Sequence, residues 1–254
     1  MIRLKNREEL KRMRAAGRVV SEVLMRLEEE AKEGVTTWEL NEIAERMCAT
    51  GGFKPAFKGY ANYPASVCFA LNEEIVHGIP SKKKMLKDGD IVGIDFGVLL
   101  DGYYADSAIT VAVGEIRPVA EKLLRVTRDS LYRGIDVVKS SNRVLDISKE
   151  IQTYVENEGF SIVRDFVGHG IGRELHEEPQ VPNFIPPNGK GGGIRLRSGM
   201  VMAIEPMVNE GSEKTKILED GWTAVTYDGK LSAHFEHTVA LTDNGPEILT
   251  ERIH

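Results

Sequence analysis

The chain has 254 residues, of which 41% are hydrophobic and 28% are charged, and its net charge is −6. These values are ordinary for a soluble globular protein. Acidic and basic residues are interspersed without a basic stripe, which argues against nucleic acid or an anionic membrane as a partner. No apolar run reaches the length of a membrane span, and the first residues lack the apolar core of a signal peptide. We therefore expect a cytoplasmic protein in which Cys48 and Cys68 stay free thiols.

The first half of the chain predicts two helices followed by a β-hairpin. Apolar residues at three- and four-residue spacing predict a helix over about residues 7–30. A capping-box pattern, Thr36 to Glu39, opens a second helix that ends at about residue 51. Residues 53–80 look irregular, and the segment 91–113 then predicts a hairpin that turns at Asp101-Gly102.

The second half repeats this order. Helices are predicted over about residues 118–138 and from about residue 141 to 158. Strand-like segments follow at 161–168, 200–208, 223–227 and 231–241. We therefore expect a single domain with an internal duplication, of which the halves are about 1–114 and 115–254. The one clear long loop, 182–193, is rich in proline and glycine and is predicted to frame a cleft.

Five polar residues interrupt otherwise apolar or glycine-rich segments: Asp95, Asp106, His169, Glu205 and Glu236. An acid inside an apolar strand carries a large desolvation cost unless something compensates it. Asp95 and Asp106 lie on the two arms of the first hairpin, opposite or diagonal to one another. Their carboxylates then lie within roughly 5–8 Å, so a cation or a shared proton must intervene.

Taken singly, each of these residues could be an exposed or salt-bridged side chain. Together they offer oxygen and imidazole ligands and no thiolate, a set that suits divalent ions such as Mn, Fe, Co or Zn. Bridging carboxylates can hold two such ions about 3.5–4 Å apart, and the pair activates a water for attack on a carbonyl or phosphoryl centre.

The motifs around these residues resemble those of the methionine aminopeptidases, in their short type I bacterial form. The resemblance covers essentially the whole chain. It rests on Asp95 and Asp106 and on four motifs: Asn72-Glu-Glu-Ile-Val-His77-Gly-Ile-Pro80, Gly-His-Gly-Ile-Gly at 168–172, Ala-Ile-Glu-Pro-Met at 203–207, and Phe-Glu-His-Thr at 235–238.

The resemblance implies an α+β fold of the pita-bread type. In this fold a curved antiparallel sheet, formed by halves related by a pseudo-twofold axis, is backed by helices. The metal site would lie on the concave face. Asp95 would bind one ion, His169 and Glu205 would bind the other, and Asp106 and Glu236 would bridge the two.

The implied reaction removes an N-terminal methionine when the second residue is small. A metal-activated hydroxide attacks the scissile carbonyl, and Glu205 shuttles the proton. His176 would hydrogen-bond the carbonyl oxygen, and His77 would contact the scissile amide nitrogen. The methionine side chain would be bound by Tyr60, Tyr63, Cys68, Leu175 and Trp222, although Tyr60 and Tyr63 could instead be ordinary packing residues.

The resemblance also suggests a monovalent cation near Asn72, Glu74 and Ser232. It implies nascent polypeptide N-termini as substrates, association with the ribosome, and a monomeric protein.

Three residues depart from the usual family pattern: His234 replaces a frequent Gln, Leu175 a frequent aromatic residue, and Ala203 a frequent Thr. None of them removes a metal ligand. The alternatives are an X-Pro aminopeptidase or prolidase, whose usual further N-terminal domain this length cannot hold, and a non-catalytic binding module, which would be expected to lack ligands.

Overall fold

The structure, a computed structural model, describes residues 2–187 and 192–252. Its helices are α1 (Arg7–Glu30), α2 (Thr37–Gly51), α3 (Pro118–Asp136) and α4 (Val144–Asn157), with a short 3-10 turn at Tyr60–Asn62. The strands of the first half are β1 (Lys54–Pro55), β2 (Val67–Leu71), β3 (Glu74–Val76), β4 (Ile91–Leu100) and β5 (Tyr103–Ala112). Those of the second half are β6 (Ser161–Ile162), β7 (Gly168–Gly170), β8 (Glu177–Val181), β9 (Val201–Ile204), β10 (Met207–Asn209), β11 (Thr215–Ile217), β12 (Ala224–Thr226), β13 (Ser232–His234), β14 (His237–Thr242) and β15 (Gly245–Ile248).

The four predicted helices are confirmed, and their ends follow from local chemistry. The side chain of Asn6 accepts hydrogen bonds from the first turn of α1, which completes a capping box with Glu9. The predicted capping box of Thr36 and Glu39 opens α2. This helix ends at Gly52, whose φ of 72° lies in the left-handed region that favours glycine.

The predicted hairpin is also confirmed, since β4 and β5 pair along their whole length. The expectation that residues 53–80 are irregular is wrong, because this segment supplies β1, β2 and β3. Strand β2 is buried along almost its whole length, so it lacks the alternation of apolar and polar residues that reveals a half-buried strand. Its neighbours place it beside β4, in the order β1-β4-β2.

In the second half, the main sheet has the order β15-β14-β9-β7-β8, and all of its pairs are antiparallel. Single strands were predicted over 161–168, 200–208 and 231–241. These three predictions are wrong in one respect, because each segment contributes to two short strands separated by a break. One break falls at Glu205-Pro206, where proline has no N–H to donate to a neighbouring strand. Another falls at Phe235-Glu236, where the N–H of Glu236 donates to the carbonyl of Ala108 in the first half, at 2.9 Å.

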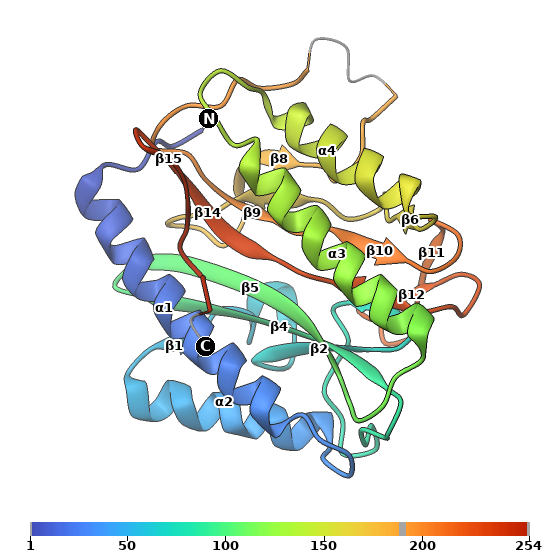
Figure 1. The fold of residues 1–254 in the computed structure, drawn as a ribbon. Coiled ribbons are helices and arrows are strands. Elements are labelled where there is room, and N and C mark those ends of the chain that lie inside the picture. Colours follow the sequence, from blue (N-terminus) through green and yellow to red (C-terminus); the bar gives the residue numbers. More distant parts are fainter. Residues whose placement is uncertain (1, 188–191, 253–254) are drawn as a thin grey trace.

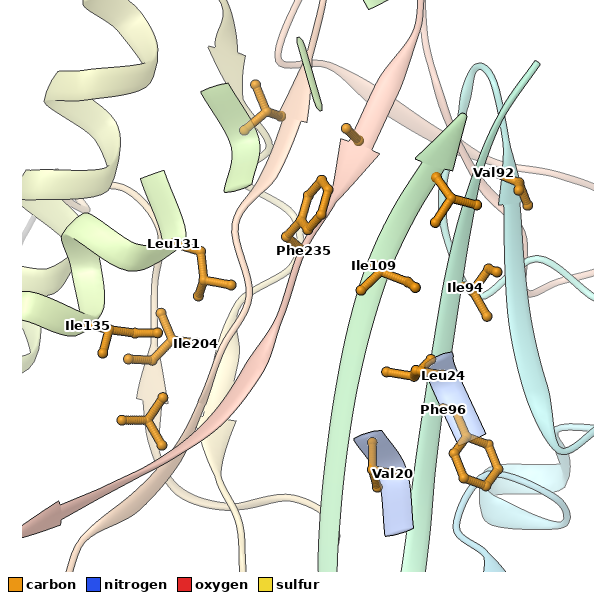
Figure 2. Close-up of a cluster of buried hydrophobic side chains, with 14 of the residues drawn as sticks. Val20, Leu24, Val92, Ile94, Phe96, Ile109, Leu131, Ile135, Ile204 and Phe235 are labelled. Carbon is orange, nitrogen blue, oxygen red and sulfur yellow. The ribbon is translucent and has the colours of Figure 1, made fainter. Parts of the chain in front are cut away.

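Helices cover one face of the strands, with α1 over β4 and β5 and α3 over β9, β10 and β13 of the second half (Figure 1). Figure 2 shows the side chains that fill these two contacts. Val20 and Leu24 of α1 lie on the same side of the sheet as Ile94, Phe96 and Ile109, whereas Leu131 and Ile135 of α3 lie near Ile204 and Phe235.

This packing decides where the polar residues point. Successive side chains of a strand face opposite sides. Because Ile94 and Phe96 face the helices, Asp95 between them faces the other side of the sheet. Glu205 follows the core residue Ile204, and Glu236 follows the core residue Phe235. The apolar core therefore turns the acids toward the face that the helices leave open.

The internal duplication stays a prediction, although each half does present two helices and then antiparallel strands. Of the loop predicted over 182–193, residues 188–191 lie outside the described residues. Among the described helices, none is long and apolar enough to cross a membrane.

Candidate active site

Asp95 and Asp106 lie diagonally across β4 and β5, as predicted. Asp95 pairs in register with Ala108, and Asp106 pairs with Gly97. Each acid is therefore two residues from the position opposite its partner, and both side chains project from the same face. Glycine at position 97 leaves room there, because a Cβ on it would lie 3.2 Å from the Cβ of Asp106.

The second half of the chain places His169, Glu205 and Glu236 beside this pair of aspartates. Asp106, His169 and Glu236 each offer a ligand atom, and these atoms all lie within 4.8 Å of one another. The Nε2 atom of His169 lies 3.7 Å from Oδ2 of Asp106 and 3.6 Å from Oε1 of Glu205. Asp95 lines the same cavity. The five residues predicted as metal ligands are thus collected in one place, from both halves of the chain.

Hydrogen bonds hold the two halves together at this point. The hydroxyl of Thr238, on β14, accepts from the backbone N–H of Asp106 at 3.1 Å and donates to its carbonyl at 2.7 Å. The hydroxyl of Ser107 donates to the carbonyl of Glu236. These contacts fix the backbone of both predicted bridging acids, so their side chains are positioned before any ligand arrives.

His169 is oriented by its own backbone neighbours. Its Nδ1 atom lies 2.9 Å from the carbonyl oxygen of Gly170, which can only accept, so Nδ1 carries the proton. Nε2, which faces the carboxylates, is then a free lone pair suited to a metal ion. A Cβ at Gly168 would lie 2.4 Å from the carbonyl oxygen of Ala203, and one at Gly170 would lie 2.3 Å from that of Glu178. Only glycine lets the strand carry His169 this close to its neighbours.

Because these acids are buried, their charged forms are costly in free energy. Asp106 and Glu236 are 4% and 2% exposed. Burial raises the pKa of Asp106 to about 6. It also raises the pKa of Asp95, and the nearby charge of Asp106 adds to this effect. The pKa values of Glu205 and Glu236 are likewise raised well above the usual range, first by burial and then by neighbouring carboxylates.

These groups fit a site for divalent cations. Among the described residues, the groups in salt-bridge contact with the four acids are imidazoles, and no lysine or arginine compensates them. Oδ1 of Asp95 is buried and has no hydrogen-bond partner among the described residues. Several buried carboxylates without a positive partner are stable in ionised form only when a cation binds between them. Oxygen and imidazole ligands suit Mn, Fe, Co or Zn.

His176 and His77 lie beside this cluster. The ring centroid of His176 is 4.3 Å from that of His169, and its Nδ1 atom lies 2.6 Å from the hydroxyl of Tyr60. His77 has a φ of 62°, an uncommon value for a residue with a side chain, and its ring meets Phe166 edge-on at 5.4 Å. Burial lowers the pKa of both histidines to about 4, so both are neutral at pH 7.

A cavity of about 340 Å³ opens between these residues, and every residue predicted for the site lines it. This volume suits a side chain or a small ligand. Cys68 pairs in register with Asp95, which places its thiol on the face of the metal ligands. Tyr63 is 3% exposed and meets Trp222 edge-on at 5.1 Å. Tyr60, by contrast, is 44% exposed, which excludes the alternative that it is an ordinary core residue.

Sequence reasoning missed several apolar residues of the lining: Phe57, Val76, Phe166, Val167 and Met207. Each of the last four lies within three residues of a predicted site residue, and this adjacency is the signal that could have identified them. Phe57 lies three residues from the predicted site residue Tyr60, so it carries the same signal.

Two of the three departures from the family pattern also line the cavity, namely Leu175 and His234. His234 is 3% exposed, and its Nε2 atom lies 3.7 Å from Oε2 of Glu205. Ala203, on β9, is buried and pairs in register with His169 and Thr238. It therefore lies between a ligand and the residue that holds Asp106.

A profile of metallopeptidase family M24 matches residues 11–243. With the metal-binding geometry above, this match shows that the chain belongs to that family of metallopeptidases. Among its members, a methionine aminopeptidase of Clostridium perfringens is 55% identical over 250 residues, which cover 98% of this chain and 99% of the relative. The chain therefore falls in the methionine aminopeptidase branch of the family, as its motifs predicted.

Comparison with solved structures supports the same family assignment. A methionine aminopeptidase of Thermotoga maritima superposes with a TM-score of 0.96 at 46% identity, covering 99% of this chain and 100% of the other. The pita-bread fold predicted from the resemblance is thus confirmed. A prolidase of Pyrococcus horikoshii has a TM-score of 0.79 at 23% identity, covering 99% of this chain and 64% of that protein, and it shares the fold alone.

Proposed function

We propose that this protein hydrolyses the peptide bond after an N-terminal methionine when the next residue is small. The observation that carries the proposal is the position of the buried Asp/Glu/His cluster at the wall of an apolar cavity of about 340 Å³. A site for divalent ions beside an apolar pocket suits a peptidase that holds one apolar side chain and cleaves next to it.

The residues present would hold two divalent ions of the Co, Mn, Fe or Zn kind. Asp95 would bind one of them, His169 and Glu205 the other, and Asp106 and Glu236 would be shared. When bound, the ions would supply activation of a water molecule and polarisation of the scissile carbonyl. The rest of the chemistry falls to side chains of this chain.

Glu205 is the proposed proton carrier. Its carboxylate, which lies beside His169 and lines the cavity, would accept a proton from the attacking water and return it to the departing amine. The backbone carbonyl of Glu205 accepts from the amide of Asn183 at 3.0 Å, which anchors this residue at the break between β9 and β10.

His176 would donate to the carbonyl oxygen as negative charge develops. If the hydroxyl of Tyr60 donates to Nδ1 of this neutral ring, the proton of the ring is on Nε2 and is available to the substrate. His77 lines the same cavity, against Phe166 and Trp222, and would contact the scissile amide nitrogen.

The methionine side chain would lie against Cys68, Tyr63, Leu175 and Trp222. The hydroxyl of Tyr63 donates to the carbonyls of Val67 and Gly78, at 3.2 and 2.9 Å, so this wall is fixed in place. A fixed wall limits the length of the side chain that the cavity accepts.

The family implies peptide or protein N-termini as substrates. Nascent chains, a cytoplasmic location, a monomeric state and contact with the ribosome stay predictions. A monovalent cation near Asn72 and Ser232 also stays a prediction. Glu74, its third predicted neighbour, is ion-paired with Lys84, so Asn72 and Ser232 would have to supply the ligands.

The experiment is a peptide panel with enzyme loaded anaerobically with Mn, Fe, Co or Zn in turn. We expect rapid release of methionine from Met-Ala-Ser, slow release from Met-Leu-Ser, and little cleavage of Ala-Pro peptides. Faster cleavage of Xaa-Pro than of Met-Ala-Ser would favour a prolidase-like enzyme. Metal binding without cleavage of any peptide would favour the binding module.

A further inference from the structure

His234 is a buried imidazole to which the proposed reaction assigns no role. It lines the cavity, is 3% exposed, and its Nε2 atom has no hydrogen-bond partner among the described residues. A buried polar atom without a partner is costly, and in a cavity wall it commonly marks a contact that is completed only when the site is occupied.

Glu205 is the nearest acceptor to this atom. Its Oε2 lies 3.7 Å from Nε2 of His234, slightly beyond a hydrogen bond, while its Oε1 lies 3.6 Å from Nε2 of His169. The carboxylate thus lies between two imidazoles. Because Nδ1 of His169 carries the proton of that ring, its Nε2 cannot donate to Glu205. His234 has no such constraint and can donate.

The backbone of His234 is fixed, so its ring can act as a rigid support. The hydroxyl of Thr110 accepts from its N–H at 2.9 Å and donates to its carbonyl at 2.8 Å. His234 also pairs in register with Met207, two residues beyond Glu205. His234 and Glu205 are therefore held at the ends of neighbouring short strands. A shift of some tenths of an ångström in one side chain would complete a hydrogen bond between Nε2 of His234 and Oε2 of Glu205.

We propose that His234 is a positioning residue for Glu205, with Nε2–H donating a hydrogen bond to Oε2 of this carboxylate in the metal-loaded enzyme. The proposal deepens the proposed function, on which it rests. Oε1 of Glu205 then stays beside His169, where it would be available to an ion, and Oε2 is held by His234 in the orientation needed to take and return a proton. An ordered donor of this kind typically changes activity by about 10- to 100-fold.

The test compares His234→Gln, His234→Asn and His234→Leu in the full chain. The amide nitrogen of glutamine reaches about as far as Nε2 of histidine, whereas that of asparagine stops near Nδ1. We expect His234→Gln to keep most of the kcat for Met-Ala-Ser, and the Asn and Leu variants to lose about 10- to 100-fold in kcat with little change in KM. All three should bind as many ions as the parent.

Three outcomes would overturn the proposal: full activity of His234→Asn, failure of His234→Gln to restore activity above that of His234→Leu, or loss of an ion, which would make His234 a ligand. If the parent itself does not cleave Met-Ala-Ser, the proposed function fails, and a second measurement still decides the inference. Nitrogen-15 NMR of histidine-labelled, zinc-loaded parent, with the His234 signal assigned by its absence in His234→Gln, should show a proton on Nε2. A bare Nε2 would contradict the proposal.

Discussion

Asp95 and Asp106 lie diagonally across two paired strands, with both carboxylates on the face that the helices leave uncovered. Their repulsion, together with burial, raises the pKa of Asp95. A strand pair that was selected only for stability would not keep two such acids side by side. The relationship therefore ties the fold to the metal site, and several predictions of this structure depend on it.

Substitution of a glycine that flanks His169 tests how closely β7 and β9 must pack. Gly168→Ala places a methyl group 2.4 Å from the carbonyl oxygen of Ala203. We expect it to lower the free energy of unfolding by about 1–3 kcal/mol and to weaken metal binding, because β7 must move. Gly93→Ala, with its nearest contact at 3.2 Å, is the matched control and should cost less. Urea unfolding and metal titration measure both effects, and equal losses in the two variants would contradict the prediction.

Metal ligands and substrate-contacting residues should separate by mutation. Glu236→Ala removes an acid that is 2% exposed at the centre of the cluster, so bound metal and activity should both be lost. His77→Ala removes a residue that lines the cavity but is not one of the proposed ligands. It should lower kcat about a hundredfold while metal content stays near that of the parent. Elemental analysis after gel filtration, with kinetics on Met-Ala-Ser, checks both, and loss of metal from His77→Ala would contradict the division.

Metal affinity should depend on pH through the buried carboxylates, all of which have raised pKa values, and Asp106 shows how. Its pKa is raised to about 6 by burial, so at pH 5 the folded, metal-free protein holds a proton that an ion must displace. Affinity should therefore rise from pH 5 to pH 7, by about tenfold per pH unit for each proton released. The pKa of His169 is lowered to about 4 by burial, so its ring does not compete in this range.

Calorimetric titration with Mn²⁺ in buffers of different ionisation enthalpy counts the released protons. For folding of the metal-free protein the pH dependence has the opposite sign. An acid whose folded pKa is raised destabilises the metal-free protein as pH rises from the unfolded value toward about 6, and bound metal should reverse that contribution. An affinity that does not change between pH 5 and pH 7 would contradict the prediction.

The two tryptophans offer a matched test of the methionine pocket. Trp222 lines the cavity and contacts the ring of Tyr63, whereas Trp38 lies in α2, away from the cavity lining. Trp222→Ala should raise KM for Met-Ala-Ser about 10-fold or more, since each methylene of a buried apolar contact contributes roughly 1–3 kcal/mol to discrimination. Trp38→Ala should leave KM unchanged. A similar rise in both variants would indicate a general loss of structure.

The parts of the fold that were predictable are those that depend on neighbours in sequence. Periodic apolar residues predicted α1, and the Thr36–Glu39 capping box with apolar residues predicted α2, to within about one residue, because these signals lie inside the helix or at its end. Of the breaks in the long strands, the one at Glu205-Pro206 has a local signal, because proline ends strand pairing, but the one before β14 has none. The break before β14 depends on the hydrogen bond of Glu236 to Ala108, which belongs to the other half of the chain.

The same distinction between local and tertiary interactions decides which parts of the site could be predicted. Asp95 and Asp106 could be placed together because a hairpin is a local structure with a readable turn. The contact of His169 and Glu236 with Asp106 depends on tertiary interactions such as those of Thr238. The chemistry of the residues grouped them beforehand, but only the family resemblance indicated which of them would bridge two ions. Two further contacts have no signal in the sequence and are visible only in the three-dimensional structure. They are the contact of Gly170 that orients the His169 ring, and the approach of His234 to Glu205.

The most direct test of the two-metal site is the number of divalent ions bound at saturation, measured by anaerobic titration with Mn²⁺ or Co²⁺ while methionine release from Met-Ala-Ser is followed in the same samples. We predict two ions per chain, and activity that is lost with chelator and returns as the ions are restored. Binding of no ion, or full activity in the chelated protein, would contradict a site built from these four carboxylates and His169.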